Sequence, residues 1–238
     1  MIIPTQKQEI RNYLLSRKIP IDILLEVEDH FISQILETQK TKNLGFNEAF
    51  ITVKSVWSDD LRMKYSFWLH EYAPNFVMKL MRKEFSHSAK IAILFSSLLV
   101  LLSMLLARFN SYEVFMTSYF VINLVVLVVP ILVLIFLTVK RYAFFNTSYK
   151  SMKYSIYQKN LVYITLGFIF QIEKIISPDR AAQKFIRYLS SDFLTFNYFI
   201  FLISVLVLTA VSIFGFLNLI RHQKTVNRLK NQFRTIRN

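Results

Sequence analysis

The chain has 238 residues, of which 54% are apolar, and it carries a net charge of +14 without a single cysteine. Disulfides, thiolate metal sites and cysteine nucleophiles are therefore excluded. The positive charge is uneven, because residues 1–90 hold 13 Lys and Arg against 11 acids, whereas residues 91–238 hold 16 against 4. A basic excess that flanks apolar segments indicates membrane topology and anionic lipid as a partner, and it makes nucleic acid the least favoured partner.

Residues 1–66 predict a small helical domain. The N-terminus lacks the continuous apolar stretch of a signal peptide, so we expect this domain to remain in the cytoplasm. Thr5 is a candidate N-cap with Gln8 three residues later, and Pro20 ends the first helix. The second helix, after Pro20, buries a stripe of apolar side chains at helical spacing: Leu24, Val27, Phe31 and Ile35.

A third helix is predicted to begin at Asn47, after the turn at Gly45. Its apolar side chains recur every three or four residues: Phe46, Ala49, Phe50, Val53, Val56 and Trp57. The acidic side of the second helix, with Asp22, Glu26 and Glu37, is expected to face solvent. Three short helices of this kind can bury one another's apolar stripes, which gives a three-helix domain of marginal size.

Residues 67–90 differ in composition and are predicted to form an interfacial amphipathic linker. Aromatic residues come first, with Trp68, Tyr72 and Phe76 suited to a membrane interface. Basic residues follow, and three of them are expected to face lipid phosphate groups: Lys79, Arg82 and Lys83.

The segment 91–220 is predicted to be a four-helix transmembrane bundle, which makes the whole chain all-α. Its uncharged stretches are residues 91–107, 114–139, 160–172 and 193–220. The last of them would reach about 40 Å as a helix, more than a hydrocarbon core of roughly 30 Å requires. The linker between the first two stretches is so short that these helices must form an antiparallel hairpin, and Pro130 predicts a kink in the second helix.

The stretch 160–172 is ambiguous by length, because its 13 residues reach only about 20 Å as a helix. The charges of the loops favour a crossing. With four spans, 15 Lys and Arg lie on the inner side and 5 on the outer side, whereas three spans give 13 and 7. Four spans with both termini in the cytoplasm are therefore predicted, with Lys159, Glu173 and Lys174 at the membrane boundaries.

Two basic segments are predicted to contact anionic lipid. The tail 221–238 places apolar side chains on one helical stripe among six cations and no acid, which is typical of a helix on the inner leaflet. Docking of this tail on a cytoplasmic partner is the alternative. The loop 140–159 is similar in charge. The candidate lipid-contacting residues of the two segments are Lys140, Arg141, Arg228, Lys230 and Arg234.

Residues that usually carry chemistry are absent from the predicted spans, which contain no Asp, Glu, Lys, Arg or His. Proton relays and intramembrane catalysis generally need such groups, so we expect no enzyme, no catalytic residue and no cofactor. Asn123 is expected to hydrogen-bond another helix, with a polar pore position as the alternative. Glu26 and His30 lie four residues apart on one helical face, but a metal site needs three or four converging ligands, so none is predicted.

The N-terminal sequence resembles the HAAS-type, or permease-prefix, helical domains of bacterial multi-pass membrane proteins. The residues that carry the resemblance are Tyr13, Leu14, Pro20, Glu26, Asp29, His30, Gly45, Glu48, Ala49 and Phe50. In that family a short helical domain precedes several membrane helices, often in signalling or transport-associated proteins. The resemblance implies a bacterial inner-membrane protein with an accessory or regulatory domain, and it supplies no catalytic residue.

These observations favour a non-enzymatic, multi-pass protein of the inner membrane whose N-terminal domain makes regulatory or scaffolding contacts with a cytoplasmic or membrane protein. The candidate contacts to that partner are Glu26, Asp29 and His30. The alternative is a small transporter or permease subunit whose pathway forms when copies assemble. A homo-oligomer is compatible with both hypotheses.

Overall fold

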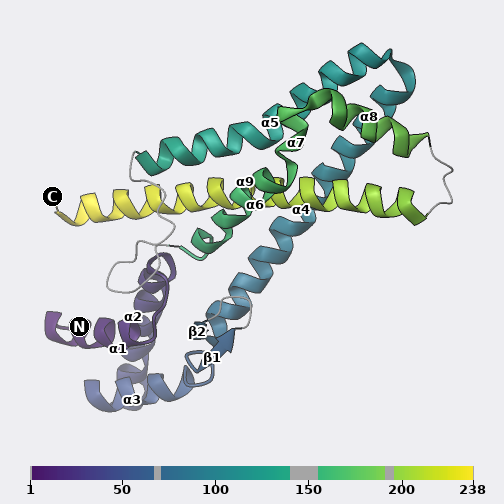
Figure 1. Cartoon of the computed structure of the whole chain (residues 1–238). Coiled ribbons are helices and arrows are strands. Elements are labelled where there is room, and N and C mark those ends of the chain that lie inside the picture. The colour runs from purple at the N-terminus through teal and green to yellow at the C-terminus, as the bar shows by residue number, and fades with distance from the viewer. Residues whose placement is uncertain (1, 67–70, 140–154, 191–195, 238) are drawn as a thin grey trace. The chain divides into compact units, whose positions relative to one another are not determined.

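The structure, a computed structural model, describes residues 2–66, 71–139, 155–190 and 196–237 (Figure 1). Side chains are described for all of these residues except 66, 71, 137–139 and 230–237. The described chain is almost entirely helical, so the all-α class predicted from the sequence is confirmed.

The chain divides into two compact units. The first unit comprises Met1–Glu84, Asn146–Ile156 and Thr225–Asn238. The second unit comprises Phe85–Phe145 and Tyr157–Lys224.

Three helices begin the first unit: α1 (Pro4–Ser16), α2 (Ile21–Lys42) and α3 (Phe46–Val56). The apolar stripe predicted for α2 is confirmed, because all four of its side chains are buried. On α3 the predicted residues Ala49, Phe50 and Val53 are buried too. Val56 is instead 71% exposed, because α3 ends at this residue and it is the next one, Trp57, that packs back on Phe31.

The starts of α1 and α3 differ from the prediction by one or two residues. Helix α1 begins at Pro4, where a missing N–H costs nothing, so Thr5 lies inside the first turn and is not the N-cap. The N-cap of α3 is Gly45, whose backbone N–H donates to Glu48 Oε2 at 3.2 Å. Asn47 therefore lies within the first turn of α3.

An ion pair that the sequence did not predict joins α1 to α2. Arg11 donates from Nε and Nη2 to the two carboxylate oxygens of Glu28, at 2.8 and 3.0 Å. The Glu28 side chain is only 2% exposed. Removing one partner of such a pair leaves a buried charge unmatched, which costs roughly 3 kcal/mol or more. The pair therefore fixes how α1 lies on α2.

A short hairpin follows the three helices, with strands β1 (Met63–Ser66) and β2 (Glu71–Pro74). The strands are antiparallel, and Tyr65 lies opposite Tyr72 with ring centroids 5.4 Å apart. No strand was predicted here. Strands of four residues are too short to show a clear alternation of apolar and polar side chains in the sequence. The contact between the two tyrosines helps to stabilise the hairpin.

The predicted interfacial linker is not a separate element. Helix α4 (Asn75–Phe109) starts directly after β2 and continues without a break into the first predicted span. Phe76, expected at the membrane interface, packs on Trp57 with ring centroids 6.2 Å apart and so belongs to the first unit. Trp68 lies outside the described residues.

Three of the described helices are long and apolar enough to cross a membrane: α4, α5 (Tyr112–Val139) and α9 (Phe196–Arg237). By length and composition the chain is therefore a membrane protein. Only two residues separate α4 from α5, and Pro130 lies inside α5. Large apolar side chains stay exposed along these helices, including Leu94, Leu132 and Ile203, each at least 58% exposed. Such surfaces suit hydrocarbon better than water.

The remaining helices of the second unit are short: η1 (Gln158–Leu161), α6 (Val162–Gln171), α7 (Glu173–Ile176) and α8 (Pro178–Leu189). Helix α6 runs antiparallel to α9. At one end Asn160 donates from Nδ2 to Asn218 Oδ1 at 2.9 Å, and at the other Gln171 donates from Nε2 to the carbonyl of Leu208 at 2.7 Å. The uncertain stretch 160–172 is thus a ten-residue helix with its flanking turns, too short to be one of the three long apolar helices.

Glycines allow α6 and α9 to approach closely. A Cβ atom added to Gly215 of α9 would lie 2.6 Å from the backbone nitrogen of Ile164 on α6. A Cβ atom on Gly167 of α6 would overlap Ser212 of α9. Two of the chain's three glycines therefore lie in this contact, on opposite helices.

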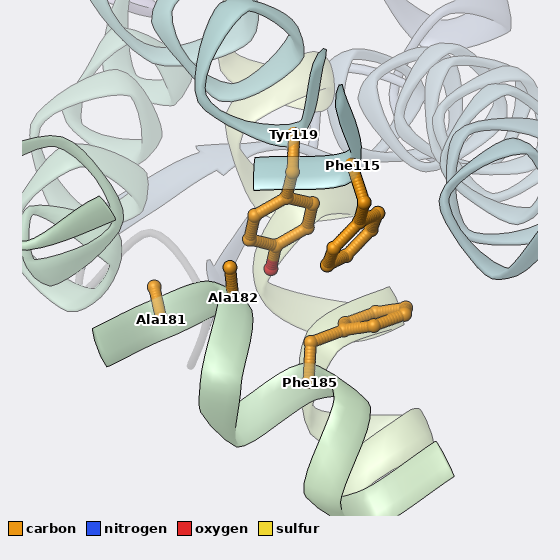
Figure 2. Close-up of a cluster of buried hydrophobic side chains, with 5 residues drawn as sticks. All are labelled: Phe115, Tyr119, Ala181, Ala182 and Phe185. Atoms are coloured by element: carbon orange, nitrogen blue, oxygen red, sulfur yellow. The ribbon is translucent and has the colours of Figure 1, made fainter. Parts of the chain in front are cut away.

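Helix α8 is amphipathic, and its apolar side covers the start of α5. Figure 2 shows the Phe185 ring beside the rings of Phe115 and Tyr119, and the centroid distances are 5.6 and 5.2 Å. Ala181 and Ala182 complete this buried cluster. The opposite side of α8 is polar and exposed, with Arg180, Gln183, Lys184 and Arg187.

Candidate functional site

A polar cluster surrounds Lys174, a residue of α7. Gln171, at the end of α6, attaches this cluster to α9, because its amide donates to the carbonyl of Leu208 at 2.7 Å and to the hydroxyl of Ser212 at 3.0 Å. The side-chain oxygen of Gln171 accepts a hydrogen bond from Lys174 Nζ at 2.6 Å. Gln171 therefore holds the ammonium group of Lys174 inside the second unit.

The cluster borders a cavity of about 20 Å³, which has room for one water-sized particle. Residues of α4, α5, α7 and α9 line it. The polar lining residues are Ser103, Tyr119, Asn123, Lys174 and Thr209, and the others are aliphatic. Among the described residues no acidic side chain lines the cavity, and Lys174 is the ionisable cation at its border.

The cavity is level with the middle of the apolar stretches. Leu99 is the central residue of 91–107, and Val205 and Thr209 flank the centre of 193–220. A charged group at such a depth is costly in a bilayer, and ionisable residues found there usually serve a function. The position of Lys174 therefore makes this cavity the candidate functional site.

Lys174 has few partners for its charge. Besides Gln171, its Nζ lies 5.9 Å from the centroid of the Tyr119 ring, within reach of a cation–π interaction. Among the described residues no carboxylate pairs with it, because the neighbouring Glu173 binds Lys184 at 2.6 Å. The sequence predicted Lys174 at the membrane boundary. In the structure it lines the cavity together with Leu99 and Thr209, because the ten-residue helix α6 ends just before it.

Asn123 also differs from the prediction. Its Nδ2 donates to the carbonyl of Tyr119, one turn earlier in the same helix, at 2.7 Å, and within the described part of the chain it has no bond to another helix. Ser103 likewise donates to the carbonyl of Leu99 in its own helix. Such local bonds satisfy polar groups within membrane helices. The Thr209 hydroxyl has no hydrogen-bond partner among the described residues, so it is available to a particle in the cavity.

The first unit contains a second candidate site, where the end of α9 docks on α2. Arg228 donates from Nη2 to Glu26 Oε1 at 3.0 Å. The next residue, Leu229, is 5% exposed and packs against Ile21, with Leu15 and Leu25 around them. Among the described side chains, the end of α9 thus contacts α2 through an apolar contact and an ion pair whose two side chains are mainly exposed.

Asp22 lies beside this contact, on the first turn of α2. Burial raises the pKa of its carboxyl group to about 7, and the charge of Glu26 acts in the same direction. Hydrogen bonds from the backbone N–H groups of Ile156 and Ile23 oppose the shift. Asp22 was predicted to face solvent. It is only partly exposed, because residues 155–156, which are themselves buried, cover the start of α2.

The basic residues predicted to face lipid lie in several environments. Lys79 pairs with Asp60 at 3.3 Å, but the two side chains are 66% and 49% exposed, so the pair is weak. Arg82 and Lys83 are exposed on α4. Lipid contact by these three residues stays a prediction. Outside the described part of the chain lie Lys140 and Arg141, together with the side chains of Lys230 and Arg234.

The three residues predicted to contact a partner lie in two different environments. Glu26 is engaged by Arg228, whereas Asp29 and His30 are exposed on α2. Sequence reasoning missed the Lys174 cavity and the docking of α9. One available signal was the position of Lys174, two residues beyond an uncharged run too short to cross a bilayer alone.

Compared with known proteins, the chain matches no family model, no curated protein and no solved structure.

Proposed function

We propose that this chain is a non-enzymatic, multi-pass inner-membrane protein whose N-terminal helical domain makes regulatory or scaffolding contacts with a protein partner. The observation that carries the proposal is the docking of α9 on α2 through Arg228 and Leu229. Helix α9 is continuous from its apolar stretch to this contact. A partner that binds the N-terminal helices is therefore mechanically connected to a membrane helix.

The proposed topology has four crossings and two cytoplasmic termini. Support comes from the path of residues 158–189 along α9. Asn160 meets Asn218, Gln171 meets Leu208, and Tyr188 stacks on Phe201 with ring centroids 4.4 Å apart. The 17 residues of α9 between 201 and 218 span about 25 Å, most of a hydrocarbon core. The third crossing would thus be made by α6, α7 and α8 together.

The partner is proposed to contact the exposed side of α2 at Asp29 and His30. Both side chains are accessible, and both belong to the part of the sequence that resembles HAAS-type or permease-prefix domains. Several proteins of that kind occur beside transcription regulators, which makes a cytoplasmic regulatory protein the partner that we propose. Anionic lipid is the second proposed partner, at the exposed cations Arg82 and Lys83.

The proposal can be tested by purifying the full chain from its native membranes in mild detergent, after brief chemical crosslinking. We expect a cytoplasmic regulatory protein to copurify, and expect the double variant Asp29→Lys, His30→Glu to lose it. Glu9→Lys, on the exposed side of α1, is the matched control and should retain it. Purification without any protein partner would contradict the proposal.

The Lys174 cavity favours a second candidate function, that of a small transporter or permease subunit. A partly buried cation among apolar membrane helices is a usual feature of ion and substrate pathways. The cavity holds only one water-sized particle, so a wider pathway would have to form between copies of the chain. Copurification with a nucleotide-binding subunit would favour this function over the first.

A further inference from the structure

We propose that the cavity beside Lys174 binds one small inorganic anion of the size of chloride. The ammonium of Lys174 would supply its counter-charge, and the Thr209 hydroxyl a further hydrogen bond. This inference rests on the second unit alone and does not depend on the function proposed for the N-terminal domain.

The first reason is the unmatched charge. An ammonium group has three N–H donors, and among the described residues that of Lys174 finds one acceptor, Gln171 Oε1. The side chain of the adjacent Glu173 is engaged by Lys184. A charge removed from water requires an opposite charge or hydrogen bonds to compensate it. A bound anion would meet both needs.

The second reason is the chemistry of the lining. Besides Lys174, the cavity is bordered by Thr209, whose hydroxyl has no partner among the described residues, and by Asn123. The Asn123 amide donates to Tyr119 of its own helix, so it adds polarity to the lining. Donors of this kind around a cation, with no carboxylate among them, select an anion and disfavour a metal ion.

The third reason is size. A cavity of about 20 Å³ admits one water-sized particle. A monatomic halide is of this order, whereas sulfate, phosphate and organic carboxylates have several heavy atoms and fit this space less well.

The test is halide-dependent stability of the full chain in nanodiscs of zwitterionic lipid. A ligand that binds only the folded state raises the unfolding temperature as its concentration rises, and the effect saturates. We expect chloride and bromide to give a saturable increase, and gluconate or sulfate at equal ionic strength to give none. The variant Lys174→Met should lose the increase. Arg187→Met, which removes an equal charge from the exposed side of α8, should keep it.

A second variant covers the case in which Lys174→Met does not fold. Thr209→Val keeps the shape of the side chain and removes the hydroxyl, so it should fold and show a weaker halide effect. The proposal is overturned if the unmodified chain shows no difference between halide and gluconate. It is also overturned if Lys174→Met responds to halide as the unmodified chain does.

Discussion

The carboxyl group of Asp22 makes the stability of the first unit depend on pH. Its pKa is about 7 in the folded chain and near 4 when unfolded, so the folded state holds the proton more tightly. The stabilising contribution of this proton is complete below pH 4 and is lost as the pH rises to 7. It arises because Asp22 lies under residues 155–156, beside the docked end of α9.

Replacing Asp22 by Asn should remove this pH dependence, because the amide stays neutral. Above pH 7 we expect the free energy of unfolding of the first unit, measured with urea, to be higher in the variant than in the unmodified chain by up to about 4 kcal/mol. Near pH 4 the two free energies should be nearly equal. Asp29→Asn, on the exposed side of the same helix, is the control. If both variants keep the pH slope of the unmodified chain, Asp22 is not the group responsible.

At the scale of elements, the contact between α6 and α9 depends on glycine. In the Gly215→Ala variant the new methyl group would lie 2.6 Å from the backbone of Ile164, which cannot move without shifting α6. Overpacking of this kind costs roughly 1–3 kcal/mol. Thermal unfolding followed by circular dichroism in detergent should show a lower transition temperature. Gly45→Ala is the matched control, since its nearest atom is a flexible Glu48 oxygen at 3.9 Å. An equal change in both variants would contradict the packing described here.

Long and strongly periodic elements could be predicted from the sequence, and short ones could not. The buried stripe of α2 and the three long apolar helices follow from hydrophobic spacing and length. Helix α8 was not predicted, although Ala181, Ala182 and Phe185 recur at helical spacing. Its segment is charged and lies between two apolar stretches, which is also the pattern of a connecting loop. The hairpin of β1 and β2 has only four residues a strand, too few for a clear pattern.

For the whole molecule, the contacts that bring distant segments together were beyond sequence reasoning. The basic tail could be predicted to be amphipathic, but its contact with Glu26 joins residues 202 positions apart. The same holds for Lys174, whose depth depends on how the short α6 packs against α9. A charge beside an apolar run can lie at a membrane surface or inside a bundle, and only tertiary packing decides between them.

The topology of the whole chain is open to a direct test, because the chain contains no cysteine of its own. Single cysteines can be placed at Ser190, an exposed residue at the end of α8, and at Ser58, an exposed residue after α3. With four crossings, a membrane-impermeant thiol reagent should label Ser190→Cys on intact spheroplasts. Ser58→Cys, and a cysteine added after Asn238, should react only once the membrane is opened. This pattern is expected because it leaves 15 Lys and Arg inside and 5 outside. Labelling of the cysteine after Asn238 on intact spheroplasts would instead show three crossings, with α6, α7 and α8 folded back on the inner side.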